Sequence, residues 1–304
     1  MITGQARANV EFYADVLGLR MVKKTVNFDA PQAYHLYFGD ELGSPGSILT
    51  WFEFAGAAPG RAGAGMIHSI ELGVGAEAAI EFWAGRLAAR GCETDQIGGG
   101  LSFADYDGLR FELIAPADSD GGGVPLRAAH PEIPAEHAIA GILGARAYAQ
   151  EPGRAEPLLT DTLGFTSAGG GHYRLDGERR RFRWTLEDPP ELPGRQGAGT
   201  VHHIAWSCRD EDHLAWRDRV LETGAYVTEV KDRDYFRSIY FREPRGVLFE
   251  IATLSPGFAV DEDPERLGEE LRLPRMHAHL RDQLERTLTP LVNPRVARRE
   301  QIPG

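Results

Sequence analysis

Cysteine and long apolar runs are both scarce in this chain, and each scarcity excludes a class of protein. Only two cysteines occur among 304 residues, Cys92 and Cys208, and they stand far apart in no paired motif. They cannot form a zinc knuckle or a disulfide framework, so we expect two reduced thiols in a cytoplasmic protein. No apolar run approaches the ~20 residues that a membrane-spanning helix needs, and residues 1–20 contain no apolar signal segment.

Positive charge is also in short supply. The 33 Lys and Arg residues are outnumbered by 45 Asp and Glu residues, which gives a formal net charge of -12. An acidic surface repels phosphate groups, so we expect no nucleic-acid partner and no binding to anionic membranes. Core-forming residues are present instead, because 42% of the chain is hydrophobic. This composition predicts a packed globular protein of about two ordinary domains.

Two tryptophan-containing segments indicate an internal repeat. Residues 79–91 read AIEFWAGRLAARG and residues 212–224 read DHLAWRDRVLETG. Each pattern predicts an amphipathic helix that is closed by a glycine. Trp83 and Trp216 are 133 positions apart, and the two closing glycines are separated by the same number of positions. Agreement at two landmarks is improbable by chance, so we infer a repeated unit.

The strands after these helices repeat as well. Residues 103–115 (FADYDGLRFELIA) and 240–252 (YFREPRGVLFEIA) both predict two strands joined by a turn. Each places a glutamate inside an apolar strand four residues after the turn glycine, namely Glu112 and Glu250. Strands are also expected just before the two helices, over residues 66–73 and 201–208.

A related pattern occurs twice more and completes the expected fold. Residues 8–20 and 155–166 both predict a helix that ends in Leu-Gly before further strand-like segments. We therefore predict an α+β fold of four βαβββ units paired into two domains. The expected parts are an N-terminal domain over residues 1–116, a Gly- and Pro-rich linker over 117–137, a C-terminal domain over 138–260, and a helical extension and tail over 261–304.

Strand alternation separates the two histidines of GTVHHIAW in the fourth unit. Successive strand residues point to opposite faces, so His202 falls with the large apolar residues, whereas His203 falls on the other face. Tyr240 and Glu250 share the face of His203. Imidazole and carboxylate are ligands that a divalent transition metal prefers, so these residues form a candidate metal site.

Structural roles are also open for these residues. Glu250 could pair with Arg242 or Arg245, and a lone strand histidine can be a hydrogen-bonded structural residue. In the second unit Ser69 occupies the position of His203, so we expect Glu112 to be structural. The remaining histidines divide into those in polar surroundings that we expect to be solvated, His130, His137, His213, His277 and His279, and those in strands of unknown facing, which include His35 and His172.

Three stretches of the chain resemble a known family. They are LGLRMVKKTVNFDAPQAYHLYFGDELGSPGSILT (residues 17–50), GTVHHIAW, and DRDYFRSIYFREPRGVLFEIATLSPGF (residues 232–258). Together with the four units they resemble the vicinal-oxygen-chelate superfamily, and more narrowly its ring-cleaving dioxygenases of para-hydroquinones. The resemblance extends from about Asn9 to Leu291 and implies cup-shaped mixed sheets.

This resemblance implies a function and a set of site residues. The implied activity is that of a non-haem iron(II) dioxygenase that opens hydroquinone-type or catechol-type aromatics with O2, with manganese(II) as a possible substitute and a homo-oligomer as a possible assembly. Two histidines and one glutamate hold the metal in that family. By position, His203 and Glu250 are metal ligands, and Tyr240, His202 and Arg233 are polar residues around the substrate.

The remaining histidine ligand has no counterpart in the sequence. The family's first unit opens with an HHIT-like strand shortly before its first helix, whereas only MITG precedes the corresponding helix here. The family histidines would fall just before Met1. We therefore expect the chain as given to lack one ligand and most of the first strand, either because the start codon is assigned too late, which we favour, or because the iron site is lost.

Two other functions are compatible with the same fold. A glyoxalase-like or epimerase-like metalloenzyme would need a second carboxylate, for which Glu53 and Glu112 are the candidates in comparable strands. A non-catalytic protein that binds a small aromatic compound would need no complete metal site.

Overall fold

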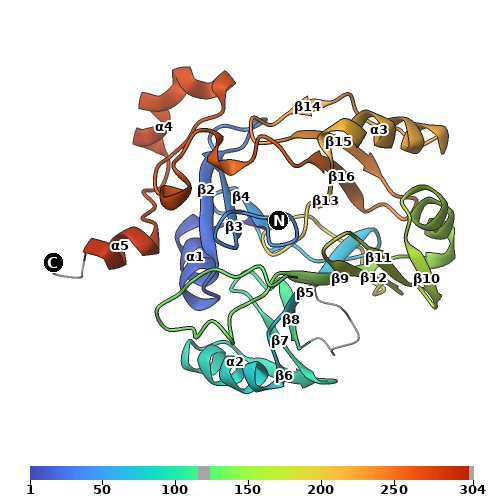
Figure 1. Cartoon of the computed structure of the whole chain (residues 1–304), viewed down its shortest axis with the longest axis horizontal. Helices are drawn as coiled ribbons and strands as arrows, with labels where there is room; N and C mark the ends of the chain where they lie inside the picture. The colour runs from blue at the N-terminus through green and yellow to red at the C-terminus, as the bar shows by residue number, and fades with distance from the viewer. Residues whose placement is uncertain (116–123, 301–304) are drawn as a thin grey trace.

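The computed structural model describes residues 1–115 and 124–300, so the first third of the predicted linker, residues 117–123, lies outside it. Its strands form three sheets with short helices around them (Figure 1). Four units follow one another along the chain, as expected, each with a first strand, a helical segment and three further strands. Within the described residues, no helix has the length and apolar character to cross a membrane.

Units one and two occupy the first 114 residues. Unit one consists of β1 (Ile2–Thr3), α1 (Ala6–Val10) with a π-helical turn (Glu11–Val16), β2 (Arg20–Val26), β3 (Tyr34–Gly39) and β4 (Leu49–Glu53). Unit two consists of β5 (Met66–Gly73), α2 (Glu77–Ala89), β6 (Thr94–Ile97), β7 (Gly100–Ala104) and β8 (Arg110–Ile114).

Units three and four follow the linker. Unit three consists of β9 (Ile142–Tyr148), a 3-10 turn (Pro152–Ala155), a π-helical turn (Leu158–Thr162), β10 (Thr166–Gly169), β11 (His172–Asp176) and β12 (Arg181–Glu187). Unit four consists of β13 (Ile204–Cys208), a 3-10 turn (Asp210–Asp212), α3 (His213–Glu222), β14 (Lys231–Asp232), β15 (Arg237–Arg242) and β16 (Leu248–Thr253).

The units pair differently from the order in which the sequence presents them. Strands β5 and β9 are antiparallel neighbours, so units two and three share one eight-stranded sheet in the order β10-β11-β12-β9-β5-β8-β7-β6. Units one and four form the four-stranded sheets β1-β4-β3-β2 and β13-β16-β15-β14. These two sheets meet where the backbone of Ile2 exchanges hydrogen bonds of 3.0 Å with Gly199 and Thr200. The expected pairing inside 1–116 and inside 138–260 is therefore wrong, because the first strand of each unit offers an open edge that any other first strand can satisfy.

Units one and three open with the same unusual helical turn. In each, a backbone N–H reaches five residues back, from Leu17 to Phe12 at 2.9 Å and from Leu163 to Leu158 at 3.0 Å. The Leu-Gly ending that predicted both helices is the point where each helix stops. Gly18 has a φ of 70° and the equivalent glycine of unit three has 79°, a backbone conformation that glycine adopts without strain.

The C-terminal extension is less helical than its composition predicts. Before Pro274 it contains one 3-10 turn, Pro264–Arg266, and another 3-10 turn, Phe258–Val260, directly precedes the extension. A 3-10 segment (Arg275–Leu280) leads into α4 (Arg281–Thr287), and α5 (Pro294–Glu300) follows, both beside β2 in Figure 1. The early part is held by ion pairs instead, because the fully buried ammonium of Lys23 binds Asp261 at 2.7 Å and also Glu262.

Two histidines expected to be solvated are buried. The ring of His213, 2% exposed, hydrogen-bonds the carbonyl of Ile251 at 3.0 Å, and that of His277, 9% exposed, bonds the carbonyl of Phe28 at 2.8 Å. Each imidazole joins a helical segment to the backbone of a distant segment. The polar surroundings in sequence did not reveal these contacts, since the partners are 38 and 249 residues away.

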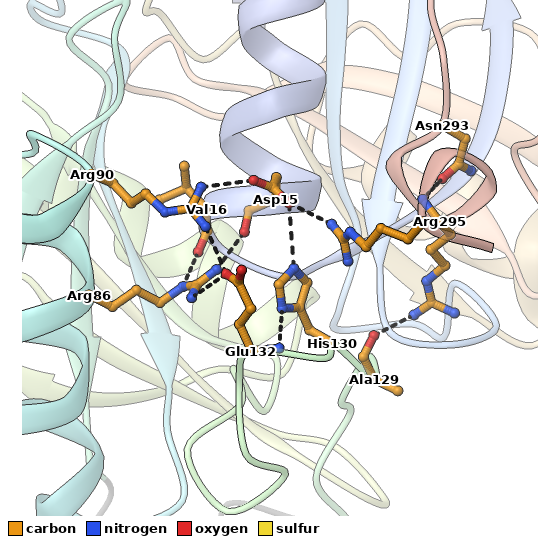
Figure 2. Close-up of polar contacts among 10 residues, drawn as sticks. Asp15, Val16, Arg86, Arg90, Ala129, His130, Glu132, Asn293 and Arg295 are labelled. Atoms are coloured by element: carbon orange, nitrogen blue, oxygen red, sulfur yellow. Dashed lines mark hydrogen bonds and ion pairs between the residues drawn. The ribbon is translucent and has the colours of Figure 1, made fainter. Parts of the chain in front are cut away.

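A cluster of polar contacts joins four parts of the chain around Asp15 (Figure 2). The Asp15 carboxylate accepts hydrogen bonds from Arg90, which directly follows α2, at 2.8 Å and from Arg298 of α5 at 2.6 Å. His130 of the linker lies 3.7 Å away, and the linker residue Glu132 binds Arg90 at 2.7 Å. This Asp15 cluster fixes the linker and the last helix against unit one.

Candidate functional site

His203 and Glu250 meet at the centre of unit four. His203 directly precedes β13, and Glu250 lies in the middle of β16, where it pairs in register with Ala205. One imidazole nitrogen of His203, Nε2, lies 2.9 Å from Oε2 of Glu250. The carboxylate is almost fully buried, with 4% of its side chain exposed. The structure therefore brings together the two residues that strand alternation placed on one face.

Tyr240 completes this group from the neighbouring strand. It pairs in register with Glu250 across β15 and β16, and its hydroxyl donates a hydrogen bond of 3.0 Å to Glu250 Oε1. Ser238 donates to the same oxygen. The shared face predicted for His203, Tyr240 and Glu250 is thus confirmed as geometry, while their roles in catalysis and metal binding stay predictions.

The surroundings lower the pKa of the Glu250 carboxyl and raise the pKa of the Tyr240 phenol. Burial raises the pKa of Glu250, but hydrogen bonds and charge from His203, with the hydroxyls of Ser238 and Tyr240, outweigh it and hold this pKa below its usual value. Burial and then the Glu250 carboxylate raise the pKa of Tyr240 well above its usual value. At neutral pH the site therefore contains a buried carboxylate beside a protonated phenol.

His202 does not point into the apolar core as alternation predicted. Regular strand begins only at Ile204, so the alternation of faces does not extend back to the doublet. Nδ1 of His202 lies 2.9 Å from Nδ1 of His203, and its ring centre is 5.8 Å from that of Phe52 in unit one. Partial desolvation at this junction, and then the neighbouring His203 and Arg242, lower the pKa of His202 to about 4, although the residue is exposed to solvent on one side. His202 is thus a neutral residue at the junction of units one and four.

Arg233 closes the other side of the group. Its Nε donates a 3.4 Å hydrogen bond to the Tyr240 hydroxyl, and its guanidinium lies over the rings of Tyr240 at 5.5 Å and Phe28 at 5.3 Å. A third contact of 3.5 Å reaches Asp29. With 20% of its side chain exposed, Arg233 links the site to solvent and links unit four to a loop of unit one.

Unit one supplies a wall of the site that the sequence analysis did not assign. His35 and Tyr37 of β3 lie on one strand face, and Phe52 of β4 pairs in register with His35. The ring of Phe52 lies 6.5 Å from that of His203. The Met1 amine is also here, donating 2.7 Å to the Thr50 carbonyl, and burial lowers its pKa to about 5. The alternation in YHLYFGD was the only sequence signal for this wall, and it could not show which partner the wall faces.

A small cavity opens beside the histidine doublet. Its volume is about 10 Å³, and its lining includes both histidines together with Gln196, Arg242 and Gly65. This is near the lower limit for one water molecule. It gives solvent a place next to the imidazoles on the side away from Tyr240.

The donor set fits two ligand positions of a metal site. The His203 and Glu250 atoms are an imidazole nitrogen and a carboxylate oxygen, which suit iron(II) or manganese(II). In residues 1–115 and 124–300, however, no three His, Cys, Asp or Glu side chains are grouped to hold one ion. The described residues therefore provide part of a two-histidine, one-carboxylate set and not all of it.

The other candidate carboxylates do not join the pair. Glu53 accepts hydrogen bonds from the backbone of Tyr34 and Ala6. Glu112 accepts a 3.0 Å hydrogen bond from Ser69, the residue that stands at the position of His203 in the second unit. Both carboxylates have structural partners, so neither supplies the second acid that a glyoxalase-like site would need.

Known proteins resemble this chain over most of its length. Residues 1–113 and 141–251 match the family described as Glyoxalase/Bleomycin resistance protein/Dioxygenase superfamily. The chain is 39% identical over 302 residues to MhqO of Bacillus subtilis (strain 168), which is described as a ring-cleaving dioxygenase; the match covers 95% of this chain and 94% of MhqO. It is 33% identical over 308 residues to the chlorohydroquinone/hydroquinone 1,2-dioxygenase of Sphingobium indicum, covering 95% and 94%.

Solved structures agree with these sequence matches. A dioxygenase crystal structure from Bacillus subtilis superposes with a TM-score of 0.88 at 39% identity, covering 96% of this chain and 95% of the other. Glyoxalase I from Zea mays superposes with a TM-score of 0.59 at 13% identity, covering 84% and 90%. The second likeness concerns the fold alone.

Proposed function

This chain belongs to the ring-cleaving dioxygenases of the Glyoxalase/Bleomycin resistance protein/Dioxygenase superfamily, and we propose that it opens hydroquinone-type or catechol-type rings with O2. The observation that carries the proposal is the buried His203–Glu250 pair, 2.9 Å apart, with Tyr240 on the same face. A relative named for hydroquinone cleavage supports the substrate class.

We propose iron(II) as the metal, with manganese(II) as the alternative, and His203 and Glu250 as two of its ligands. When bound, such an ion supplies the redox chemistry that lets dioxygen react with an aromatic ring. Glu250 is suited to the role because it stays ionised while buried. Ser238 and Tyr240 hold the orientation of the carboxylate through its other oxygen.

The remaining polar residues act on the substrate in this proposal. Tyr240 holds its proton at neutral pH and can donate it in a hydrogen bond to a substrate oxygen. Arg233 fixes the Tyr240 hydroxyl and, through Phe28 and Asp29, closes the site toward solvent. His202 is neutral, so it can accept or donate one hydrogen bond at the junction of the two units.

We propose a cytoplasmic location, because Cys92 and Cys208 are both free thiols. The proposed partners are the small aromatic substrate and O2. The acidic net charge of -12 argues against nucleic acid and anionic membranes, and a homo-oligomer is left as a possible assembly.

One observation favours a second candidate function. The wall that faces His203 presents an aromatic ring, Phe52, and the Met1 amine, and the described residues do not group a third His, Cys, Asp or Glu side chain with His203 and Glu250 around one ion. A protein that binds a small aromatic compound without cleaving it would need only such a wall.

Iron binding and oxygen consumption distinguish these functions. We expect the purified protein, loaded with iron(II) without air, to bind about one ion per chain and to consume O2 with methylhydroquinone. Glu250→Gln should weaken both iron binding and O2 consumption. If methylhydroquinone binds while the iron-loaded protein consumes no O2, the binding function replaces the dioxygenase. If neither iron nor methylhydroquinone binds, both candidates are wrong.

A further inference from the structure

His35 is a buried imidazole for which the proposed chemistry has so far no use. It lies in β3 and is 8% exposed. Its Nδ1 shares a 3.0 Å hydrogen bond with the hydroxyl of Tyr37. Its Nε2 is buried and has no hydrogen-bond partner among the described residues. Most buried polar atoms in proteins have a partner, so this nitrogen calls for one from outside the chain.

The position of His35 relates it to the proposed site. Its ring lies 4.3 Å from Phe52, and Phe52 in turn lies 5.8 Å from His202 and 6.5 Å from His203. The same phenylalanine therefore borders the His35 imidazole on one side and the unit-four doublet on the other. Burial and then the charge of Glu250 raise the pKa of the Tyr37 hydroxyl, so the wall formed by His35 and Tyr37 faces the unit-four site.

The charge state of His35 makes it a selective hydrogen-bonding group. Burial lowers the pKa of His35 well below the usual value, and the positive charge of the Arg233 guanidinium lowers it further. The neutral ring has one N–H and one acceptor nitrogen. Tyr37 forms a hydrogen bond with one nitrogen of the ring. The other nitrogen can therefore form a hydrogen bond with a neutral group such as a phenolic hydroxyl rather than with an anion.

We propose that His35 is a specificity-determining residue whose Nε2 hydrogen-bonds the ring hydroxyl of the substrate that lies farther from Glu250. This inference rests on the proposed function and names the residue that recognises the second hydroxyl of such a ring. One hydroxyl faces His203 and Glu250, and the second reaches His35. The ring between them packs against Phe52 and Tyr37, as aromatic rings do in a buried apolar setting.

The expected effect is a discrimination between two-hydroxyl and one-hydroxyl rings. A site that has a buried hydrogen-bonding group rejects an analogue that leaves the group unpaired. One neutral hydrogen bond corresponds to about a tenfold change in Kd. We therefore expect wild type to bind methylhydroquinone about tenfold more tightly than meta-cresol, which lacks the second hydroxyl.

Anaerobic binding measurements on three variants test the proposal. Titration calorimetry gives the Kd of both ligands for wild type, His35→Phe and His35→Gln, with His172→Phe on the exposed strand β11 as the matched control. His35→Phe should lose the preference, through weaker binding of methylhydroquinone with unchanged binding of meta-cresol. His35→Gln, which keeps a donor and an acceptor, should retain part of the preference for methylhydroquinone over meta-cresol. His172→Phe should retain all of that preference.

Several outcomes separate this inference from the proposed function. If His35→Phe keeps the wild-type preference, or weakens the binding of both ligands equally, the inference is overturned even where wild type consumes O2. If the preference depends on His35 while iron-loaded wild type consumes no O2, the inference stands and ring cleavage fails. If wild type binds neither ligand, both are overturned.

Discussion

Glu250 is the residue on which the site depends most, because one carboxylate meets an imidazole and two hydroxyls in a space that water barely reaches. Its counterpart Glu112, at the same strand position in unit two, meets Ser69 and lies 3.8 Å from Arg146 instead. The two glutamates share a sequence pattern but differ in their partners and in burial, with 4% of the Glu250 side chain and 16% of the Glu112 side chain exposed. They therefore offer a matched pair for mutagenesis.

We expect Glu250→Gln to reduce kcat/KM for methylhydroquinone at least about 100-fold, because removing a group that holds a metal or its ligands costs on this order or more. Glu112→Gln should leave kcat/KM unchanged. Steady-state O2 consumption measures both. Equal losses in the two variants would contradict the assignment of the site to unit four.

Asp105 provides a pH-dependent term in stability. It lies in the turn between β7 and β8 and accepts a 2.6 Å hydrogen bond from Tyr13 of unit one. Burial raises its pKa from 3.8 to about 6, although hydrogen bonds from Tyr13 and Leu109 oppose the rise. The folded state therefore binds a proton more tightly than the unfolded state does.

The free energy of unfolding should consequently fall as the pH rises from about 4 to about 6, by up to about 3 kcal/mol from this group. Asp105→Asn should remove that part of the slope, since an amide does not titrate. Urea unfolding at pH 4.5 and pH 7 measures it, with Asp95→Asn on β6 as the control. An unchanged slope in Asp105→Asn would show that another group is responsible.

At the level of elements, the eight-stranded sheet of units two and three has its own polar face. Glu71 and Glu112 lie side by side on β5 and β8. Arg146 of β9 reaches Glu71 at 3.7 Å and also binds Glu187 of β12. The guanidinium occupies the centre of this face, as His203 and Glu250 do in the other pair of units. An internal cation thus balances the carboxylates here.

Arg146→Met should lower the free energy of unfolding by about 1 kcal/mol, because it removes a partly exposed cation from Glu112 and Glu187, while Glu71 keeps its ion pair with Arg183. Adding Glu112→Gln should restore part of the loss by removing one of these charges. Urea unfolding of the two single variants and the double variant measures the coupling. Strictly additive effects would mean that Arg146 and Glu112 do not interact.

Regular strands explain which parts of the site could be read from sequence. Tyr240 and Glu250 lie within β15 and β16, so alternation gave their facing. His202 precedes the first residue of β13, so the same rule failed there. The role of His35 could not be predicted from the sequence. It depends on the contact with Phe52 and on the position of unit four, and strand periodicity shows neither.

The order of elements was predictable for a similar reason. The helices expected at 79–91 and 212–224 correspond to α2 (Glu77–Ala89) and α3 (His213–Glu222), because their apolar spacing and closing glycines are local. Which first strands become neighbours depends on edges more than 70 residues apart in the chain. No local pattern carries that information, so the pairing of β5 with β9 was missed.

For the whole molecule, the Asp15 cluster is the contact that joins the linker and the last helix to unit one (Figure 2). The ion pairs made by Asp15 are about one-third exposed, with 30% of the side chain exposed for both Asp15 and Arg90 and 26% for Arg298. We expect Asp15→Ala to lower the free energy of unfolding by about 1 kcal/mol, the upper range for partly exposed pairs. Urea unfolding in low salt measures it, and Glu81→Ala on α2 is the control.

High salt should narrow the difference between wild type and Asp15→Ala, because screening weakens the same pairs in wild type. Limited proteolysis in the 124–140 segment should be faster in the variant, since Arg90, which binds Glu132 of the linker, loses its second carboxylate partner. Equal cleavage rates in the two proteins would mean that other contacts hold the linker.

The pairing of the units also sets an order of events during synthesis. Units two and three are contiguous between residues 66 and 187, so their common sheet can form while the ribosome is still translating unit four. Along the sequence, units one and four flank units two and three. The two halves of the His203 site are therefore the first and the last units to leave the ribosome. Domains that are complete in the nascent chain fold first, so we expect this site to be the last part of the molecule to form, on a scaffold that is already folded.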